Sequence, residues 1–198
     1  MQVEPSKPSK RELTHDRIVE VASRAIRRKG YDGVGVADLM NEAGLTHGGF
    51  YAHFESRSAM LAEALVRAGQ DSVAGVAAQI HARRAQGDSA LRALIEIYLG
   101  DAHRCEVENG CPVAALGSEM SRQPTELQAA SVGRVTALIA AVQTALPPDA
   151  APTSAPLIAS TLVGAVQLAR ALGTTDARAG QALLAVVRQQ LLDQFEPG

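Results

Sequence analysis

Tryptophan is absent from this 198-residue chain, which has only three phenylalanines, three tyrosines and two cysteines. Just two of the aromatic residues, Tyr98 and Phe195, lie beyond residue 54. An aromatic cage for a cationic ligand is therefore not expected in the later part of the chain. The cysteines, Cys105 and Cys111, are too few for a disulfide scaffold. Together with His103 they match no zinc-binding spacing, so no metal site is predicted.

Long apolar runs and catalytic motifs are missing as well. No stretch of about 18 consecutive apolar residues occurs, which argues against a transmembrane helix. Residues 1–14 are polar and basic where a secretory signal would be apolar. We therefore expect a cytoplasmic protein that does not associate with a membrane. No Ser-His-Asp order, glycine-rich phosphate loop or pair of buried carboxylates is present, so neither an enzyme nor a bound cofactor is predicted.

Apolar residues recur instead at the spacing of helices. Ile18, Val21, Ala22, Ala25 and Ile26 fall at i, i+3, i+4, i+7 and i+8 and form one core-facing stripe. No window alternates as a strand would, so an all-α fold is predicted. The expected helices cover residues 14–29, 36–42, 46–54, 56–84, 90–104, 113–120, 124–146, 155–173 and 175–195, with a loop over 106–112.

Residues 43–61 are the most informative stretch. Gly44 can adopt the left-handed conformation that ends a helix, and Thr46 is well placed to cap the next one. Phe50 and Phe54 are four residues apart and share one face, which can anchor a short helix in a core. Tyr51 then lies on a different face of the helix from Phe50 and Phe54. The pattern predicts a helix-turn-helix that places a recognition helix in the major groove of DNA.

The start of the chain resembles the TetR family of bacterial transcriptional regulators over about its first third. The matching residues, at fixed spacing, are Arg17–Glu20, Gly30–Tyr31, Val36–Leu39, Ala43–Thr46, Gly48, Phe50–Tyr51 and His53–Phe54. The resemblance implies a three-helix helix-turn-helix domain at residues 13–56, preceded by a flexible basic arm at 1–12. It also implies a C-terminal helical domain at 57–198 for ligand binding and dimerisation.

The resemblance assigns the DNA contacts to the arm, the recognition helix and the start of the following helix. The predicted DNA-binding residues are Lys10, Thr46, His47, Gly48, Gly49, Tyr51, His53 and Arg57. His47 is the main polar side chain for reading bases, because Ala37 occupies a position where relatives often carry a polar reader. Gly48 and Gly49 either let the backbone approach the bases closely or merely loosen a short helix.

The charge distribution agrees with a local DNA-binding surface. Residues 1–60 carry 9 Lys and Arg against 8 Asp and Glu, whereas residues 61–198 carry 10 against 13. All three lysines lie within the first 29 residues. We therefore expect DNA to be bound by one region of a mildly acidic protein, and a symmetric dimer would double that region.

The last two predicted helices are apolar around more than half of their circumference. The family resemblance implies that residues 155–195 form a four-helix bundle with a second copy of the chain, giving a homodimer. It also places an effector pocket among the middle helices, and the candidate lining residues are Tyr98, His103, Cys111, Glu119, Met120 and Arg122. With few aromatic residues available, a small or aliphatic effector is expected.

Three hypotheses for function follow. The first is a ligand-responsive regulator, a repressor, that binds palindromic operator DNA as a dimer and is released by a small molecule. The second keeps the DNA binding but makes Cys111 a sensor of oxidants or electrophiles, with a buried, unreactive cysteine as the alternative. The third is a helical-bundle protein with a catalytic or scaffold role, in which His47 and Tyr51 would be dispensable.

Overall fold

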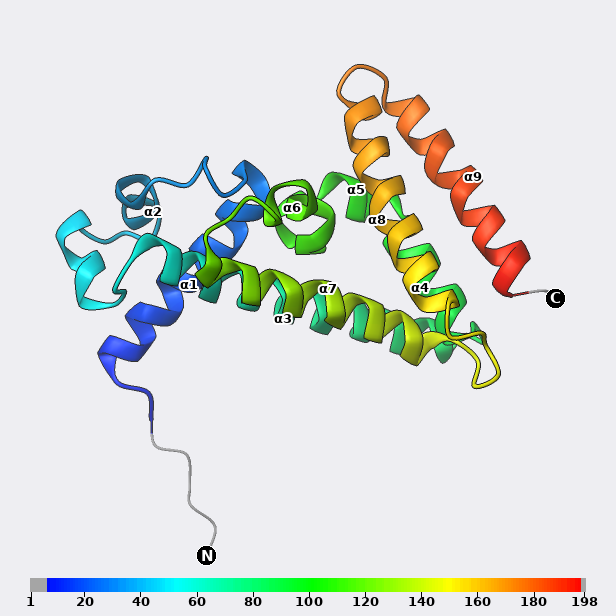
Figure 1. The fold of residues 1–198 in the computed structure, drawn as a ribbon, viewed down its shortest axis with the longest axis horizontal. Helices are drawn as coiled ribbons and strands as arrows, with labels where there is room; N and C mark the ends of the chain where they lie inside the picture. Colours follow the sequence, from blue (N-terminus) through cyan, green and yellow to red (C-terminus); the bar gives the residue numbers. More distant parts are fainter. Residues whose placement is uncertain (1–6, 197–198) are drawn as a thin grey trace, which may run out of the picture.

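The computed structural model describes residues 7–196, and all regular structure in that range is helical (Figure 1). The all-α prediction is confirmed. The elements are α1 (Lys10–Lys29), α2 (Val36–Glu42), the 3-10 helix η1 (His47–Ala52), α3 (Arg57–Arg84), α4 (Ala90–Tyr98), α5 (Asp101–Cys105), the 3-10 turn η2 (Val107–Asn109), α6 (Pro112–Met120), α7 (Thr125–Ala145), α8 (Ser154–Gly173) and α9 (Ala177–Phe195).

Two long helices connect the two ends of the molecule. Figure 1 shows α3 and α7 running side by side along its length, with α1, α2 and η1 at one end and the α8–α9 hairpin at the other. The first end has its own apolar core, in which Ile18 and Ile26 of α1 meet Leu39 of α2 and Phe50 of η1, all at most 2% exposed. Burial of these side chains stabilises the small domain and fixes η1 against α1 and α2.

Helix α1 begins at Lys10, earlier than the sequence pattern indicated. The Ser9 hydroxyl accepts a hydrogen bond from the Glu12 N–H at 3.2 Å, and the Glu12 carboxylate accepts one from the Ser9 N–H at 2.7 Å. This reciprocal capping box makes Ser9 the N-cap. The prediction of a flexible arm over residues 1–12 is therefore wrong for Lys10–Glu12, and its residues 1–6 lie outside the described residues.

The helix expected at 90–104 is broken into α4 and α5. Gly100 caps the start of α5, and the His103 ring turns back so that its Nδ1 lies 2.7 Å from the Tyr98 carbonyl oxygen. That contact satisfies a carbonyl left free at the end of α4. Helix α6 then begins with Pro112 in its first turn, where a missing N–H has no cost.

Helix α8 is apolar and 20 residues long. By length and composition alone it could cross a membrane, since its most apolar window has a mean hydropathy of 1.4. In the fold it packs against α9, α7 and α6, and Ile158, Leu162 and Val166 on its inner side are fully buried. This packing is what a core helix of a bundle requires, and it accounts for one side of the apolar surface.

Candidate DNA-binding surface and effector cavity

The predicted recognition helix forms, but as the short 3-10 helix η1 and not as the α-helix expected over 46–54. Thr46 is its N-cap without a side-chain hydrogen bond, and the Gly49 N–H donates to the Thr46 carbonyl at 3.0 Å. Two adjacent glycines disfavour α-helix, and 3-10 geometry is tolerated in a piece this short. The turn before it is as predicted, because Gly44 has a φ of 72° after α2.

The polar and small residues of η1 face solvent. Thr46, His47 and Gly48 are exposed, and Tyr51 is 70% exposed, while Phe50 beside them is fully buried. The ring of Tyr51 lies edge-on to that of Phe50, with centroids 5.2 Å apart. A buried aromatic thus holds an outward-facing tyrosine in place, so that its hydroxyl is presented to solvent.

The fold does not itself require glycine at position 48. A Cβ built there meets nothing within 4 Å, and its φ is not positive. At Gly49 a Cβ would make only ordinary contacts, 3.7 Å from Met40 Cε and 3.8 Å from Thr46 Oγ1. The space left by Gly48 is therefore open to an approaching DNA backbone or base.

The open space at Gly48 predicts that a substitution there changes DNA affinity without reducing the stability of the fold. Gly48→Ala should leave the free energy of unfolding unchanged or raise it by up to about 1 kcal/mol, because alanine favours helix. DNA affinity should fall by roughly tenfold, the scale of one lost base contact. Urea unfolding and fluorescence-polarisation titration measure the two quantities. Gly133→Ala, at an equally open helical glycine of α7, is the matched control. Unchanged DNA affinity in Gly48→Ala would contradict close approach at this position.

The side chains of Arg57 and His53, both predicted to contact phosphates, are oriented differently from the prediction. The Arg57 guanidinium donates to the Val34 carbonyl at 3.0 Å and to the Tyr31 carbonyl, so it closes the α1–α2 loop instead of extending from the surface. That loop leaves carbonyls uncovered, and the planar fork of arginine reaches both of them. His53 is half-buried, with its Nδ1 enclosed and unpartnered among the described residues.

The start of α1 reaches η1 through a residue that was not predicted. Arg11 Nη2 donates to the Ala52 carbonyl at 2.9 Å and so joins the first turn of α1 to the end of η1. Burial, followed by the nearby charges of His15 and Arg11, lowers the pKa of His53. Lys10 is exposed at the first position of α1, where it remains available to DNA.

Arg28 and Tyr31 join the helix-turn-helix domain to the segment η2–α6. Arg28 on α1 pairs with Glu42 of α2 at 3.0 Å and with Glu108 of η2 at 2.8 Å. The Tyr31 N–H donates to the Glu119 carboxylate of α6 at 3.0 Å. Burial raises the pKa of Tyr31 to about 12. These contacts place η2 and α6 directly against α1 and the loop that follows it.

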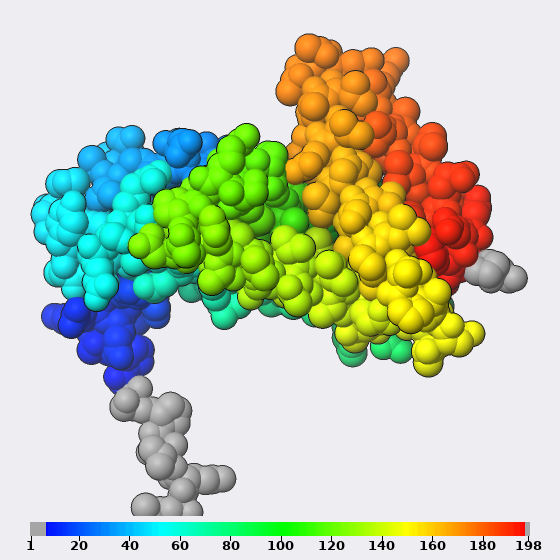
Figure 2. Space-filling model, in the orientation of Figure 1, coloured from blue at the N-terminus to red at the C-terminus, as the bar shows by residue number. Residues whose placement is uncertain are grey.

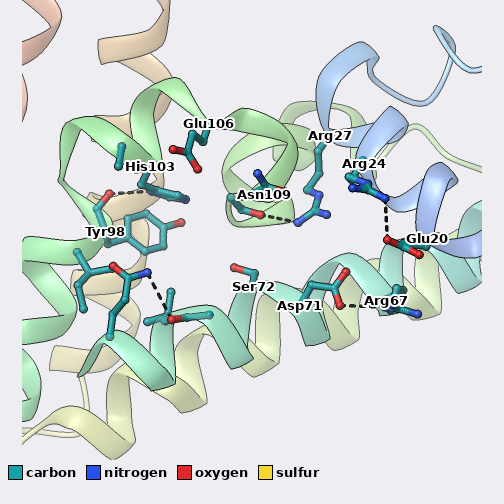
Figure 3. Close-up of a pocket in the computed structure, with 16 residues that line it drawn as sticks. Glu20, Arg24, Arg27, Arg67, Asp71, Ser72, Tyr98, His103, Glu106 and Asn109 are labelled. Atoms are coloured by element: carbon teal, nitrogen blue, oxygen red, sulfur yellow. Dashed lines mark hydrogen bonds and ion pairs between the residues drawn. The ribbon is translucent and has the colours of Figure 1, made fainter. Parts of the chain in front are cut away.

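A cavity of about 430 Å³ lies between α1, α3 and the segment from α4 to η2 (Figure 3). Tyr98 and His103, two of the residues predicted to contact an effector, line it. The cavity also contains charged and polar residues that the sequence did not suggest for this role, namely Glu20, Arg24, Arg27, Arg67, Asp71, Ser72 and Asn109. A volume of this size accommodates a small organic molecule.

A smaller apolar cavity of about 140 Å³ adjoins it between α3, α4, α6 and α7, and Tyr98 and Cys111 line that space. The Cys111 N–H donates to His103 Nε2 at 3.0 Å. Burial, with a smaller effect from the positive charge of Arg170, lowers the pKa of His103 to about 4, so the ring is neutral near pH 7. Cys111 is only 6% exposed, and this burial does not favour a thiol that meets oxidants or electrophiles freely.

The other three predicted effector residues lie elsewhere. Glu119 is committed to the Tyr31 N–H, and Arg122 is exposed beyond the end of α6. Met120 is buried and lines a separate groove between α6, α7 and α8. Helix α6 turns its C-terminal end toward the DNA-binding domain, so residues 119–122 do not reach the cavities that Cys111 borders.

Arg27 is the residue of the cavity that sequence reasoning missed most clearly. It lies in the basic run Arg27–Lys29 in the last turn of α1, where positive charges favour the helix dipole, yet it is only 3% exposed. Helix α1 buries two faces, one in the DNA-binding core and one against α3 and η2. Only the second neighbour explains the burial of Arg27, and the sequence of α1 carries no pattern that shows it.

Comparison with known proteins agrees with this arrangement. The family model described as bacterial regulatory proteins, tetR family, matches residues 18–64. Helix-turn-helix-type transcriptional regulators of two strains of Mycobacterium tuberculosis are 34% identical over 166 residues, which covers 78% of this chain and 83% of each relative. The chain belongs to the TetR family of bacterial transcriptional regulators.

Solved structures of TetR regulators share the whole fold. The regulator from Chloroflexus aurantiacus has a TM-score of 0.74 at 23% identity, covering 93% of this chain and 96% of that one. The regulator from Cytophaga hutchinsonii has a TM-score of 0.73 at 17% identity, covering 98% and 100%. This TetR-family chain therefore has the N-terminal helix-turn-helix and C-terminal helical domain expected of it, and it is a DNA-binding regulator of transcription.

Proposed function

We propose that this TetR-family protein is a ligand-responsive repressor that binds a palindromic operator as a homodimer and is released by a small molecule. The observation that carries the proposal is the outward face of η1, where His47, Gly48 and Tyr51 are exposed over the buried Phe50. His47 would read a base edge, and Thr46 and Tyr51 would hold phosphates. Acting in the cytoplasm, two such helices would engage successive major grooves.

The α8–α9 hairpin supports the dimer. Leu157, Leu168 and Leu172 on α8 and Val186 on α9 are 42–64% exposed. The one charged residue of α8, Arg170, donates its hydrogen bonds inward to carbonyls of α5 and α6. An outer face of α8 without charged residues, next to the exposed Val186 of α9, is typical of a homodimer interface. Figure 2 shows the turn end of the hairpin projecting from the molecule.

Coupling to an effector would use the contacts between η2–α6 and α1. A molecule in the cavity would touch η2 and α1 together, because Arg27 and Asn109 both line it. Movement of η2 would pull on Arg28 through Glu108 and so change the orientation of α1 and α2. DNA affinity would fall if the effector prefers an arrangement in which the two recognition helices no longer match their half-sites.

A DNA titration of point variants tests the proposal. The probe is the DNA that flanks the protein's own gene. Its binding is measured by fluorescence polarisation at two salt concentrations. Tyr51→Phe should weaken binding about threefold to tenfold by removing one phosphate hydrogen bond, and adding His47→Ala should weaken it by roughly tenfold more. Wild-type affinity should fall steeply with salt, because binding releases counterions.

Tyr31→Phe is the matched control, since its hydroxyl is buried away from η1. It should bind DNA as the wild type does. If the protein does not bind the flanking DNA, the hypothesis that it regulates its own gene is rejected. Binding sites are then selected from genomic DNA. Failure of that selection to enrich any sequence, or full binding by the Tyr51 and His47 variant, would overturn the proposal.

A further inference from the structure

The cavity between α1, α3 and η2 contains a buried arginine, Arg27, and the two carboxylates whose charge reaches it, Asp71 and Glu108, form ion pairs with other arginines. Arg27 is 3% exposed and forms no ion pair within the described part of the chain. Its Nε donates to the Ser23 carbonyl at 3.0 Å, and its Nη1 donates to the Gly110 and Ala68 carbonyls at 3.1 and 3.4 Å. Nη2 has no hydrogen-bond partner among residues 7–196, so two strong donors remain available.

The other charges of the cavity are already paired with one another. Arg24 pairs with Glu20 at 2.7 Å along α1, and Arg67 pairs with Asp71 at 2.9 Å along α3. Glu106 is exposed at the rim. Arg27 is therefore a buried cation without an ion pair of its own. Burial lowers the pKa of Arg27, and the charges of Asp71 and Glu108 offset part of that effect.

Two hydroxyl groups face the same space. Tyr98 is 3% exposed and its hydroxyl oxygen is buried without a hydrogen-bond partner in residues 7–196. Figure 3 shows that hydroxyl, the Ser72 hydroxyl and the Arg27 guanidinium turned toward the same part of the cavity. A buried hydroxyl without a hydrogen bond is unfavourable, so a bound acceptor would be favoured there. The cavity thus offers hydrogen-bond donors that point toward one another, while its carboxylates are ion-paired or lie at the rim.

The polar cavity continues into apolar space. Ser72, Val76 and Tyr98 line both this cavity and the smaller one beside Cys111. The remaining walls of the smaller cavity are largely aliphatic, including Val73, Ala77, Ile80, Leu94 and Leu138. A ligand that filled both would need a charged or polar head at one end and an apolar body at the other.

We infer that the effector is a small amphipathic carboxylate whose head lies against Arg27, Tyr98 and Ser72. The inference rests on the proposed regulatory function and names the chemical class of its effector. The carboxylate accepts from Arg27 Nη2 and from the two hydroxyls, while the apolar body extends past Val76 into the aliphatic cavity. Because Arg27 lies on α1, the head group contacts the DNA-binding domain directly. One oxygen of the ligand accepts a hydrogen bond from the helix that positions η1.

Octanoate is the probe for testing this assignment, with 1-octanol and octylammonium as matched neutral and cationic molecules. Binding is measured by titration calorimetry on the full-length protein, and DNA release by fluorescence polarisation. Octanoate should bind at least tenfold more tightly than either analogue, because only its head satisfies Arg27. Equal affinity for octanoate and octanol, or no binding of any straight-chain carboxylate of six to twelve carbons, would overturn the inference.

Variants locate the head group. Arg27→Gln should weaken octanoate binding at least tenfold, and Arg27→Lys, which keeps the charge, should weaken it less. Arg84→Gln is the control, because Arg84 is exposed at the end of α3 and lines neither cavity. It should change affinity by less than twofold. Retained octanoate binding in a folded Arg27→Gln variant would overturn the assignment, and if that variant does not fold, the Arg27→Lys result and the ligand series decide it.

The same preparations keep this test separate from that of the regulator itself. DNA binding without octanoate binding would remove the carboxylate assignment and leave the regulator in place. Octanoate binding that does not change DNA affinity would equally remove carboxylates as the effector class. Octanoate binding by a protein that selects no DNA sequence would instead remove the proposed function.

Discussion

Leu168→Glu is expected to convert the protein to a monomer and to weaken operator binding by about a hundredfold or more. Leu168 is 59% exposed on the outward face of α8, four residues from Leu172 and eleven from Leu157. A glutamate buried between two copies of this face would lack a counter-ion and would cost several kcal/mol. A monomer engages only one half-site and loses the gain in effective concentration that the second half-site provides.

Sedimentation equilibrium and operator titration on the same samples measure the two effects. Val132→Glu is the matched control, because Val132 is 65% exposed on α7 but outside the α8–α9 face. It should remain dimeric and should bind DNA normally. A Leu168→Glu variant that stays dimeric at micromolar concentration would show that the second subunit does not pack on this face. Loss of DNA binding without loss of the dimer would place the effect in folding, which circular dichroism would detect.

Helix positions were predictable where one apolar stripe faces one neighbour. The stripe from Ile18 to Ile26 gave α1 its place, and Gly44 gave the turn before η1. Two boundaries were missed for different reasons. The capping box of Ser9 and Glu12 is visible in the sequence and could have moved the start of α1. The break after Tyr98 depends on the return of His103 to its carbonyl, which is a tertiary contact.

The two candidate sites differed in how far the sequence predicted them. The DNA-binding surface is local, because Thr46, His47 and Tyr51 lie within six residues and share one anchor, so their exposure followed from the pattern. The effector cavity joins residues from α1, α3 and η2 that are far apart in the chain. Arg27 and Glu119 illustrate the limit. Arg27 is buried and Glu119 binds the Tyr31 N–H because helices distant in the sequence become neighbours in the fold.

Acid should destabilise the protein through His103. Its pKa is about 4 in the folded protein and 6.5 in the absence of the fold, so the unfolded chain binds a proton more readily at intermediate pH. The stabilising effect of the neutral ring is therefore complete above pH 6.5 and is lost as the pH falls toward 4. Between pH 7.5 and pH 5 the free energy of unfolding should decrease by about 2 kcal/mol from this residue.

Burial is the main reason why the ring resists protonation, and two of its neighbours add to the effect. His103 Nε2 accepts a hydrogen bond from the Cys111 N–H, and a proton on Nε2 would break it and add a positive charge beside Arg170. The lowered pKa values of the Glu12 and Asp101 carboxyls act in a different range. The ordinary values are 4.5 and 3.8, so their contribution is lost mainly below pH 5. The interval from pH 7.5 to 5 therefore isolates histidine.

Urea unfolding at pH 7.5 and pH 5 measures the effect, with His103→Gln as the comparison. This variant is expected to be less stable than the wild type at both pH values, and its decrease in the free energy of unfolding between them should be smaller by about 2 kcal/mol. His81→Gln, which removes another histidine near the end of α3, is the control and should keep the full decrease. An equal decrease in wild type and His103→Gln would mean that the ring is protonated in the folded protein without cost. Since the ring joins the end of α4 to the start of α6, acid would then leave the wall of the effector cavity intact, and the cavity would keep its shape down to pH 5.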